Sequence, residues 1–292
     1  MGLTEPISDG ISAGPMVAKL TDPLGIEDEG SGLLGRTQAF RDRVKAENGI
    51  IEGGSLENLY DPILRAFKGF SGVGLSDLPF FGSGSAVKIN SGAIPMLFDS
   101  SGGENDATQS DTAKQPTDAL IGSKVALYFD GSDDILTIPF QLITGSQNPT
   151  IFIVLKTQHT SDKKIVEAAG TGGINSDDAE TATPSTEYGI RVTGGNEIYN
   201  TSPSGSKELL TLRQNGPDVI DFQAWVNGSE LSVSSSSNIT TDYESGSKSW
   251  IGGWSGGPQF DGKIGSYLVT SVPLSNTNKS KIESILQDYY SI

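Results

Sequence analysis

The pattern of apolar and polar positions divides the chain into a short helical part and a longer part rich in strands and turns. Phe40 and Val44 lie four apart within residues 37–48, as they would on one face of a short helix that ends at the following Asn-Gly pair. Residues 1–36 mix glycine, proline and acidic residues with isolated apolar residues and show no sustained period. We therefore predict an extended arm over residues 1–36 and a helix after it.

A second segment with apolar residues along one helical face, an apolar stripe, follows the first helix. It consists of apolar residues at helical spacing: Leu56, Leu59, Tyr60, Ile63 and Phe67. Ser55 is placed to cap this helix, and Pro62 either kinks it or begins a new helix with Asp61 as the cap. Two short helices cannot bury such stripes by themselves, so residues 37–87 are predicted to dock on a neighbouring domain or subunit. Residues 69–86, rich in glycine, serine and proline, are predicted to be a connector.

From about residue 88 the pattern changes to short strands separated by turns. The run TIFIVLKT at 150–157 is continuous enough to be a central strand that is buried on both faces. Apolar residues alternate over 219–226, which places Trp225 opposite to the core-facing side chains. Turn signals at this spacing predict a β-sandwich, and the chain closes with an amphipathic helix that Ser275 is placed to cap. The apolar face of this helix comprises Ile282, Ile285, Leu286 and Tyr289.

Composition supports a β-rich fold and narrows the range of partners. The 292 residues include 37 glycines, which suits many tight turns, and 36 acidic against 20 basic residues, which gives a net charge of -16. An acidic surface repels nucleic-acid phosphates and anionic lipids, and no run approaches the roughly 18 apolar residues of a membrane span. We therefore expect no nucleic-acid partner and no insertion into a membrane.

Four local patterns in the strand-rich part resemble one family of β-domains. They are, in chain order, AIPMLFDSSGGENDATQ, ALYFDGSDDILTI, DFQAWVNG, and SWIGGW followed by FDGKIGSYLVTSVPLSNTNKSKIESILQDYY. Together they resemble the concanavalin A-like lectin/laminin G-like jelly-roll domain, in the form found in structural proteins of tailed-phage virions. The resemblance implies that residues 88–292 form a mainly β, antiparallel jelly-roll β-sandwich with a C-terminal helix, preceded by a small extended and helical N-terminal region.

The resemblance also implies a function and a location. The start MGLTEPISDG lacks the basic and apolar segments of an export signal, and the chain has no cysteine, which suits a virion assembled in the host cytoplasm. We predict a phage virion structural protein, such as a head or collar fibre, a capsid decoration or a tail-fibre component. Its predicted partners are other virion proteins and identical chains, with host-surface glycans as candidate ligands. The alternative is a carbohydrate-binding or adhesin module of a bacterial surface protein.

Residues suited to catalysis are scarce in the sequence. A glycan hydrolase needs two carboxylates that face each other across a groove, whereas Asp218 and Asp221, three apart, would project to opposite faces of a strand. His159 is the only histidine and cysteine is absent, which disfavours a nucleophilic hydrolase and a zinc site. We therefore predict that the protein is not an enzyme and requires no cofactor, with calcium as the one ion to consider.

Three acidic residues crowd one turn and offer hard oxygen ligands. The spacing of Asp130, Asp133 and Asp134 suits a calcium ion on the rim of a β-domain. The alternative, which the sequence favours, is that Asp130 shapes a hairpin turn while Asp133 and Asp134 are solvated.

The three tryptophans are candidate ligand-binding residues. Trp225 points away from the core face of its strand, where an aromatic ring can stack on a sugar, and Trp250 and Trp254 flank a glycine pair. The alternative, again the favoured one, is that all three pack under loops or between subunits.

Overall fold

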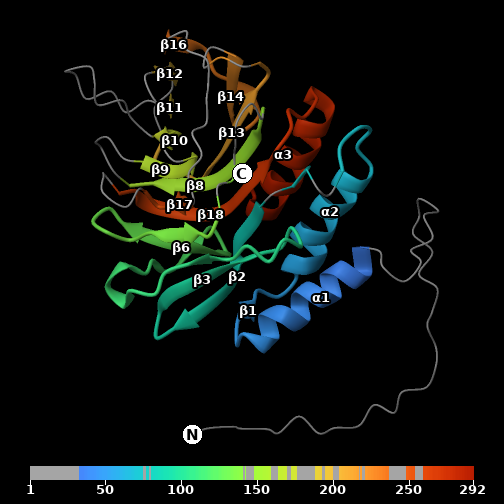
Figure 1. Ribbon diagram of the computed structural model, residues 1–292, viewed down its shortest axis with the longest axis vertical. Coiled ribbons are helices and arrows are strands. Elements are labelled where there is room, and N and C mark those ends of the chain that lie inside the picture. The colour runs from blue at the N-terminus through green and yellow to red at the C-terminus, as the bar shows by residue number, and fades with distance from the viewer. Residues whose placement is uncertain are drawn as a thin grey trace, which may run out of the picture.

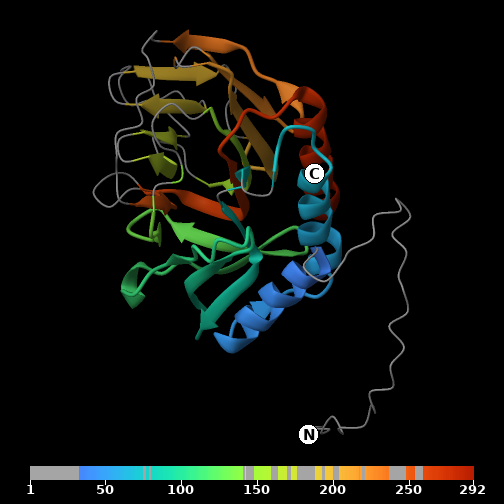
Figure 2. The same ribbon diagram turned by 45° about the vertical axis from the view of Figure 1, so that its right-hand side comes forward.

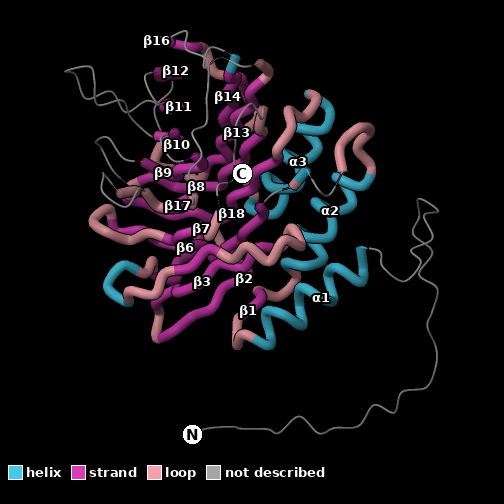
Figure 3. Tube along the Cα trace, viewed as in Figure 1, coloured by secondary structure: helices cyan, strands magenta, loops and turns pink. Residues whose placement is uncertain are grey.

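The fold is mainly β and ends in a helix, as predicted (Figure 1). Helices α1, α2 and α3 lie together on one side of the molecule, and strands form most of the rest (Figure 2, Figure 3). Among the helices that the structure describes, none has the length and apolar character needed to cross a bilayer. The computed structural model describes residues 33–74, 77–78, 80–140, 142, 148–158, 164–169, 172–175, 188–192, 195–199, 204–216, 218, 221–236, 248–253 and 259–292.

The elements are labelled in chain order. The helical elements are α1 (Leu33–Ala46), the π-helical segment η1 (Leu56–Tyr60), α2 (Asp61–Lys68), the 3-10 helix η3 (Thr112–Lys114) and α3 (Asn276–Tyr290). The strands are β1 (Ile50–Ile51), β2 (Phe80–Asn90), β3 (Ala93–Asp99), β4 (Ala107–Thr108), β5 (Thr117–Ile121), β6 (Lys124–Asp130), β7 (Leu136–Ile138), β8 (Thr150–Thr157), β9 (Lys164–Ala169), β10 (Gly172–Asn175), β11 (Gly189–Val192), β12 (Gly195–Tyr199), β13 (Glu208–Gln214), β14 (Phe222–Val226), β15 (Ser229–Glu230), β16 (Val233–Ser236), β17 (Ser249–Ile251) and β18 (Asp261–Thr270).

Antiparallel pairings connect the strands into one continuous, barrel-like sheet. In its first wall, β18 pairs with β8 along its length, and β13, β14 and β15 follow β8. In its second wall, β3, β4, β7, β17 and β9 pair in that order. Because β2 pairs with both β18 and β3, hydrogen bonding continues from one wall to the other. The antiparallel β architecture is therefore as predicted, but the walls are not two separate layers.

The strand β8 is buried on both faces, as the sequence predicts. Ile151, Ile153 and Leu155 belong to an apolar cluster between the two walls. Phe152 and Val154 belong to a second apolar cluster, which lies beneath the helices. A strand with two apolar faces needs cover on each of them, and the helices provide that cover on one side.

The N-terminal helical segment and α3 share the second cluster. Their buried side chains in it include Phe40, Val44, Leu59, Tyr60, Ile63, Phe67, Ile282 and Leu286. The apolar stripes that predicted docking of residues 37–87 are therefore buried against the sheet of the same chain. This packing accounts for the stripes without a second subunit.

The helix α1 begins earlier than predicted. It starts at Leu33, so residues 33–36 are helical and do not belong to the predicted arm. After the helix, Asn48 of the Asn-Gly pair at which the helix was predicted to end has a left-handed backbone with φ of 56°. The remainder of the predicted arm, residues 1–32, lies outside the described residues.

The residues of the second stripe form one continuous helical segment, whose first part, η1, is π-helical and therefore wider than the α-helix α2 that follows. Tyr60 and Asp61 keep right-handed helical angles where η1 passes into α2, and Pro62 stands in the first turn of α2. Asp61 therefore lies inside the helix instead of capping it, because the wider π-helical turn before Pro62 makes room for the proline ring. Ser55 does not cap the segment either, since its hydroxyl donates to the Glu52 carbonyl at 2.8 Å.

The predicted connector contains the first long strand. β2 begins at Phe80, so residues 80–87 belong to the β-rich part and the predicted boundary at residue 88 is wrong. One of the glycines that indicated a connector, Gly84, is required by close packing within the sheet. A Cβ atom on Gly84 would lie 2.6 Å from the Cα atom of Ala126, a distance that only glycine avoids.

Polar contacts anchor α3 at both ends. Ser275 caps the helix as predicted, since its hydroxyl accepts the Asn278 N–H at 3.2 Å. At the other end, the buried Tyr290 hydroxyl lies 2.8 Å from the Ser266 hydroxyl of β18 and 3.1 Å from the Ser83 hydroxyl of β2. Burial raises the pKa of Tyr290 to about 12.

The neighbouring Tyr289 ties the same end of α3 to the N-terminal segment. Its hydroxyl donates to the Glu52 carboxylate at 2.9 Å and lies 3.0 Å from the Ser85 hydroxyl of β2. The Lys124 ammonium stands 4.1 Å from the centre of the Tyr289 ring. Helix α3 is thus fixed to β2, to β18 and to the loop before η1.

We expect Phe152→Ala to lower the free energy of unfolding by about 3 to 5 kcal/mol, because it opens a cavity beneath the helices. The control Leu120→Ala removes a side chain that is 54% exposed and should change stability by less than about 0.5 kcal/mol. Urea unfolding measures both. Similar losses in the two variants would contradict the placement of the helices over β8.

We expect Tyr290→Phe to cost about 1 to 3 kcal/mol, because it leaves the buried hydroxyls of Ser83 and Ser266 without their phenol partner. When Ser266→Ala is already present, the same change should cost at least about 0.5 kcal/mol less. A double-mutant cycle in urea unfolding gives this coupling energy. Strictly additive effects would argue against the contact.

Candidate functional site

A row of side chains crosses the second wall from β2 to β17. In the strand register Lys88 is opposite Met96, Met96 is opposite Thr108, Thr108 is opposite Thr137, and Thr137 is opposite Trp250. Directly opposed residues of antiparallel strands point to the same face of a sheet, with Cβ atoms about 4.5 to 5.5 Å apart. We call these five residues the outer strip.

The outer strip lies on the face of the second wall that points away from the cluster between the walls, and its Met96 packs against the cluster beneath the helices. Side chains alternate along a strand, and a neighbour of each strip residue belongs to the apolar cluster between the walls. These inward neighbours are Val87, Leu97, Ala107, Ile138 and Ile251. Trp250 itself is half-buried, and Thr108 is exposed.

A groove of about 400 Å³ lies over this strip. Its lining comprises Lys88, Pro95, Met96, Thr108, Gln109, Ser110, Thr137, Pro139 and Lys248, and we call it the outer groove. Lys248 comes two residues before Trp250, a spacing that places both on the same face of an extended chain. The groove therefore combines apolar side chains with hydroxyl, amide and ammonium groups, and an aromatic ring lies at the next strip position.

Hydrogen bonds fix the loop that follows β4 at the edge of the groove. The Gln109 amide donates to the Ile135 carbonyl at 3.1 Å and accepts the Asp111 N–H at 3.0 Å. The Gln115 amide donates to the Gln109 carbonyl at 2.8 Å. This part of the groove is therefore held in place before any ligand arrives.

The NDATQ motif that carries the family resemblance holds β4 in position. The Asp99 carboxylate accepts the backbone N–H groups of Ser101 at 2.9 Å and Asn105 at 3.2 Å. Asp106 accepts the Asp99 N–H at 2.8 Å and pairs with Arg43 of α1 at 2.7 Å. Burial raises the pKa of Asp99, although its hydrogen bonds act in the opposite direction. The motif therefore organises the loop that leads directly into β4.

The outer groove has a positive lining in an acidic protein. Its only charged side chains among the described residues are Lys88 and Lys248, whereas the chain carries a net charge of -16. The Lys88 ammonium lies 3.9 Å from the Glu47 carboxylate, and both side chains are substantially exposed. The groove is therefore electrostatically different from the average surface of this chain.

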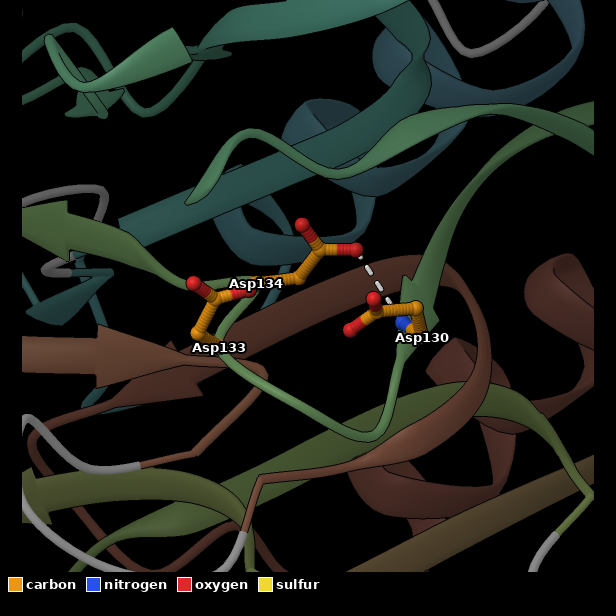
Figure 4. A group of neighbouring side chains, drawn as sticks. All are labelled: Asp130, Asp133 and Asp134. Carbon is orange, nitrogen blue, oxygen red and sulfur yellow. Dashed lines mark hydrogen bonds between the residues drawn. The ribbon is translucent and has the colours of Figure 1, made fainter. Parts of the chain in front are cut away.

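The three predicted calcium ligands do come together in one turn (Figure 4). Asp130, Asp133 and Asp134 each offer one carboxylate oxygen, and these oxygens lie within 4.8 Å of one another. Asp134 accepts the Asp130 N–H at 3.0 Å, and Asp130 accepts the Ser132 N–H at 2.8 Å. Burial raises the pKa of Asp134 to about 6, and repulsion from Asp130 and Asp133 acts in the same direction.

This turn differs from the predicted hairpin. β6 pairs with β5 and β18, whereas β7 pairs with β4 and β17. The turn therefore connects two strands that have different pairing partners in the sheet. Asp133 is exposed, as predicted for a solvated residue, but Asp134 is buried because it folds back onto the Asp130 N–H. Calcium binding at this turn stays a prediction.

The predicted tryptophans have different environments. Trp225 faces away from the core, as predicted, but it is only 5% exposed because the Lys279 ammonium of α3 stands 4.1 Å from its ring centre. The Arg213 guanidinium lies 5.1 Å from the same ring. The prediction of a ligand platform at Trp225 is therefore wrong. Trp250 belongs to the outer strip, and Trp254 lies outside the described residues.

Sequence reasoning identified Trp250 and missed the groove beside it. Lys88, Thr108, Thr137 and Lys248 come from strands and turns far apart in the sequence, and they meet only when the second wall is assembled. The one local signal in the sequence was Trp250 itself, an aromatic residue next to the inward-facing Ile251 of β17.

Comparisons with known proteins found similarity in structure. No family model matches the sequence, and no curated protein sequence is significantly similar to it. A Trypanosoma rangeli sialidase in complex with sialic acid is 11% identical with a TM-score of 0.50, over 81% of this chain and 38% of that chain. Domain 4 of an extracellular arabinanase from Geobacillus stearothermophilus, in complex with arabinotriose, is 13% identical with a TM-score of 0.43, over 58% of this chain and 80% of that chain. An arabinofuranosidase complexed with arabinofuranosyl-alpha-1,2-xylobiose is 15% identical with a TM-score of 0.49, over 66% and 50% of the two chains.

The prediction that the chain is not an enzyme is contradicted by a fold shared with a sialidase, which is an enzyme. The likeness to the sialidase concerns the fold, and the chain spans well under half the length of that enzyme. The prediction failed because it sought paired carboxylates within one strand, whereas side chains from several strands meet on a sheet face. Asp221 instead accepts the Asp218 N–H at 2.9 Å, and His159 lies outside the described residues.

We expect Asp134→Asn to stabilise the protein by about 1 to 2 kcal/mol at pH 8, after allowance for solvent screening. The folded state raises the Asp134 pKa from 3.8 to about 6 and so binds this proton more tightly than the unfolded state does. Wild-type stability therefore falls as the pH rises through this window, whereas asparagine keeps an acceptor for the Asp130 N–H without the charge.

Urea unfolding at pH 4 and pH 8, in buffers without divalent ions, measures this effect. The advantage of the variant should disappear at the lower pH. A difference between variant and wild type that is independent of pH would contradict the assignment.

Proposed function

We propose that the protein binds a glycan in the outer groove, with the Trp250 ring as the surface on which one sugar ring stacks. The observation that carries this proposal is the place of Trp250, which is half-buried and directly opposite Thr137 of the groove. A sugar has an apolar face and a rim of hydroxyl groups. A partly exposed aromatic ring beside fixed polar groups matches both.

The lining of the groove supports a ligand rich in hydroxyl groups. The hydroxyls of Thr108, Ser110 and Thr137 can each donate and accept a hydrogen bond. Pro95 and Met96 add apolar surface between them. The volume of about 400 Å³ falls within the range of roughly 300 to 1,000 Å³ that is typical of small-ligand sites.

The β-rich body supports the same class of ligand. We propose that it is a concanavalin A-like jelly roll, as the sequence resemblance implies. The motifs of the resemblance lie at β3 with the NDATQ segment that contains β4, at β6 and β7, at β14 with the turn of Asn227 and Gly228, and at β17 and β18 with the helix that follows. A lectin-like body that presents a groove on its outer face is consistent with glycan recognition.

The setting in which the groove works stays a prediction of the sequence resemblance. We propose a phage virion, with other virion proteins and identical chains as partners, and a bacterial adhesin module as the alternative. The apolar stripes of residues 37–87 no longer support assembly with another chain, because they are covered within this one. The virion proposal therefore depends on the sequence patterns alone.

We expect Trp250→Leu to weaken glycan binding by at least about tenfold, because it removes the stacking surface, whereas Trp250→Phe should retain most of the affinity. A glycan array identifies the sugar, and titration calorimetry with that sugar compares the variants. Unfolding midpoints confirm that each variant is folded.

Full affinity in Trp250→Leu, or an array on which nothing binds, would contradict the proposal. The calorimetry samples are also analysed for shorter sugars. Their appearance would extend the proposal from binding to hydrolysis.

A further inference from the structure

We infer that the glycan bound by the outer groove carries a negative charge, as a carboxylate or a sulfate on a sugar ring. The inference rests on the proposed function and names the class of ligand for the same site. Its starting observation is the contrast between a chain with 36 acidic and 20 basic residues and a groove whose described lining has Lys88 and Lys248 but no acidic residue.

The groove lacks the groups that would recognise an uncharged sugar most strongly. Carboxylates accept hydrogen bonds from sugar hydroxyls strongly, and none is present among the described lining residues. The Gln109 amide is already engaged, since it donates to the Ile135 carbonyl and accepts the Asp111 N–H. The charged groups that remain for a ligand are ammonium groups, which only donate and therefore suit anionic oxygens.

Both ammonium groups are available to a ligand. Lys248 is exposed, and no carboxylate of the described part of the chain forms an ion pair with it. Lys88 contacts Glu47 at the long distance of 3.9 Å, with both side chains in contact with solvent. Pairs of this kind add little to stability, so an acidic group of a ligand can replace Glu47 at small cost.

The strip on which the groove lies is long enough for an oligosaccharide. It crosses four strand spacings from Lys88 on β2 to Trp250 on β17, and at about 4.8 Å per spacing this is about 19 Å. A chain of sugars laid across the strands can therefore stack at Trp250 and still reach the ammonium group of Lys88.

The overall charge of the protein opposes the binding of a negatively charged glycan. A net charge of -16 repels an anionic ligand at long range, so a preference for the charged form must come from local contacts. Removal of the lysine that contacts the acidic group should therefore abolish or reverse the preference.

Titration calorimetry with matched sugars tests the inference. One pair is an oligogalacturonate and its methyl ester, and the other is a sulfated oligosaccharide and its desulfated form. We expect the charged member of at least one pair to bind about tenfold or more tightly than the neutral member, the effect of one charge-assisted hydrogen bond. The pair that shows the difference distinguishes a carboxylate from a sulfate.

Three lysine variants locate the effect. At least one of the variants Lys88→Gln and Lys248→Gln should weaken binding of the charged form about tenfold and leave binding of the neutral form unchanged. Lys68→Gln is the matched control, because Lys68 is exposed at the end of α2 on the helical side of the molecule. This control should keep the wild-type preference.

Equal affinities for charged and neutral sugars would overturn the inference, as would an unchanged preference in both Lys88→Gln and Lys248→Gln. If a neutral sugar binds in that case, and Trp250→Leu weakens it, the proposed function stands without the inference. If neither member of any pair binds and the glycan array is also blank, both fail.

Discussion

The two apolar faces of β8 are the constraint on which the rest of the structure depends. Ile153 and its inward neighbours must be shielded by the second wall, and Phe152 and Val154 must be shielded by helices. The N-terminal helices and α3 therefore pack on the same side of the sheet, although they lie at opposite ends of the sequence. The hydrogen bonds of Tyr290 to β2 and β18 hold α3 in this position.

Helix α1 packs over the outer face of the second wall at β3, where Phe98 is buried in the cluster beneath the helices, and the outer groove lies on the part of that face beyond α1. Short strands such as β4, β7 and β17 form much of this wall, and their outward side chains make the outer strip. The same division explains the different environments of two tryptophans on the sheet. Trp225 lies on the first wall under Lys279 of α3, whereas Trp250 lies on the second wall beside the groove.

Local sequence patterns were sufficient for elements whose signal is local. The continuous apolar run of β8 and the Ser275 cap of α3 are examples, because spacing and a single side chain determine them. The patterns failed where tertiary packing decides, as at Gly84, whose close contact with Ala126 lies inside a strand. The groove could not be predicted because its residues meet through strand register, and register is set by the assembled sheet.

The position of a bound sugar is the most direct test of the outer groove. In a crystal structure with an anionic oligosaccharide, we expect one sugar ring against Trp250 and the acidic group within hydrogen-bond distance of Lys88 or Lys248. A sugar bound at the turn of Asp130, or on any other surface while the groove stays open, would contradict the account.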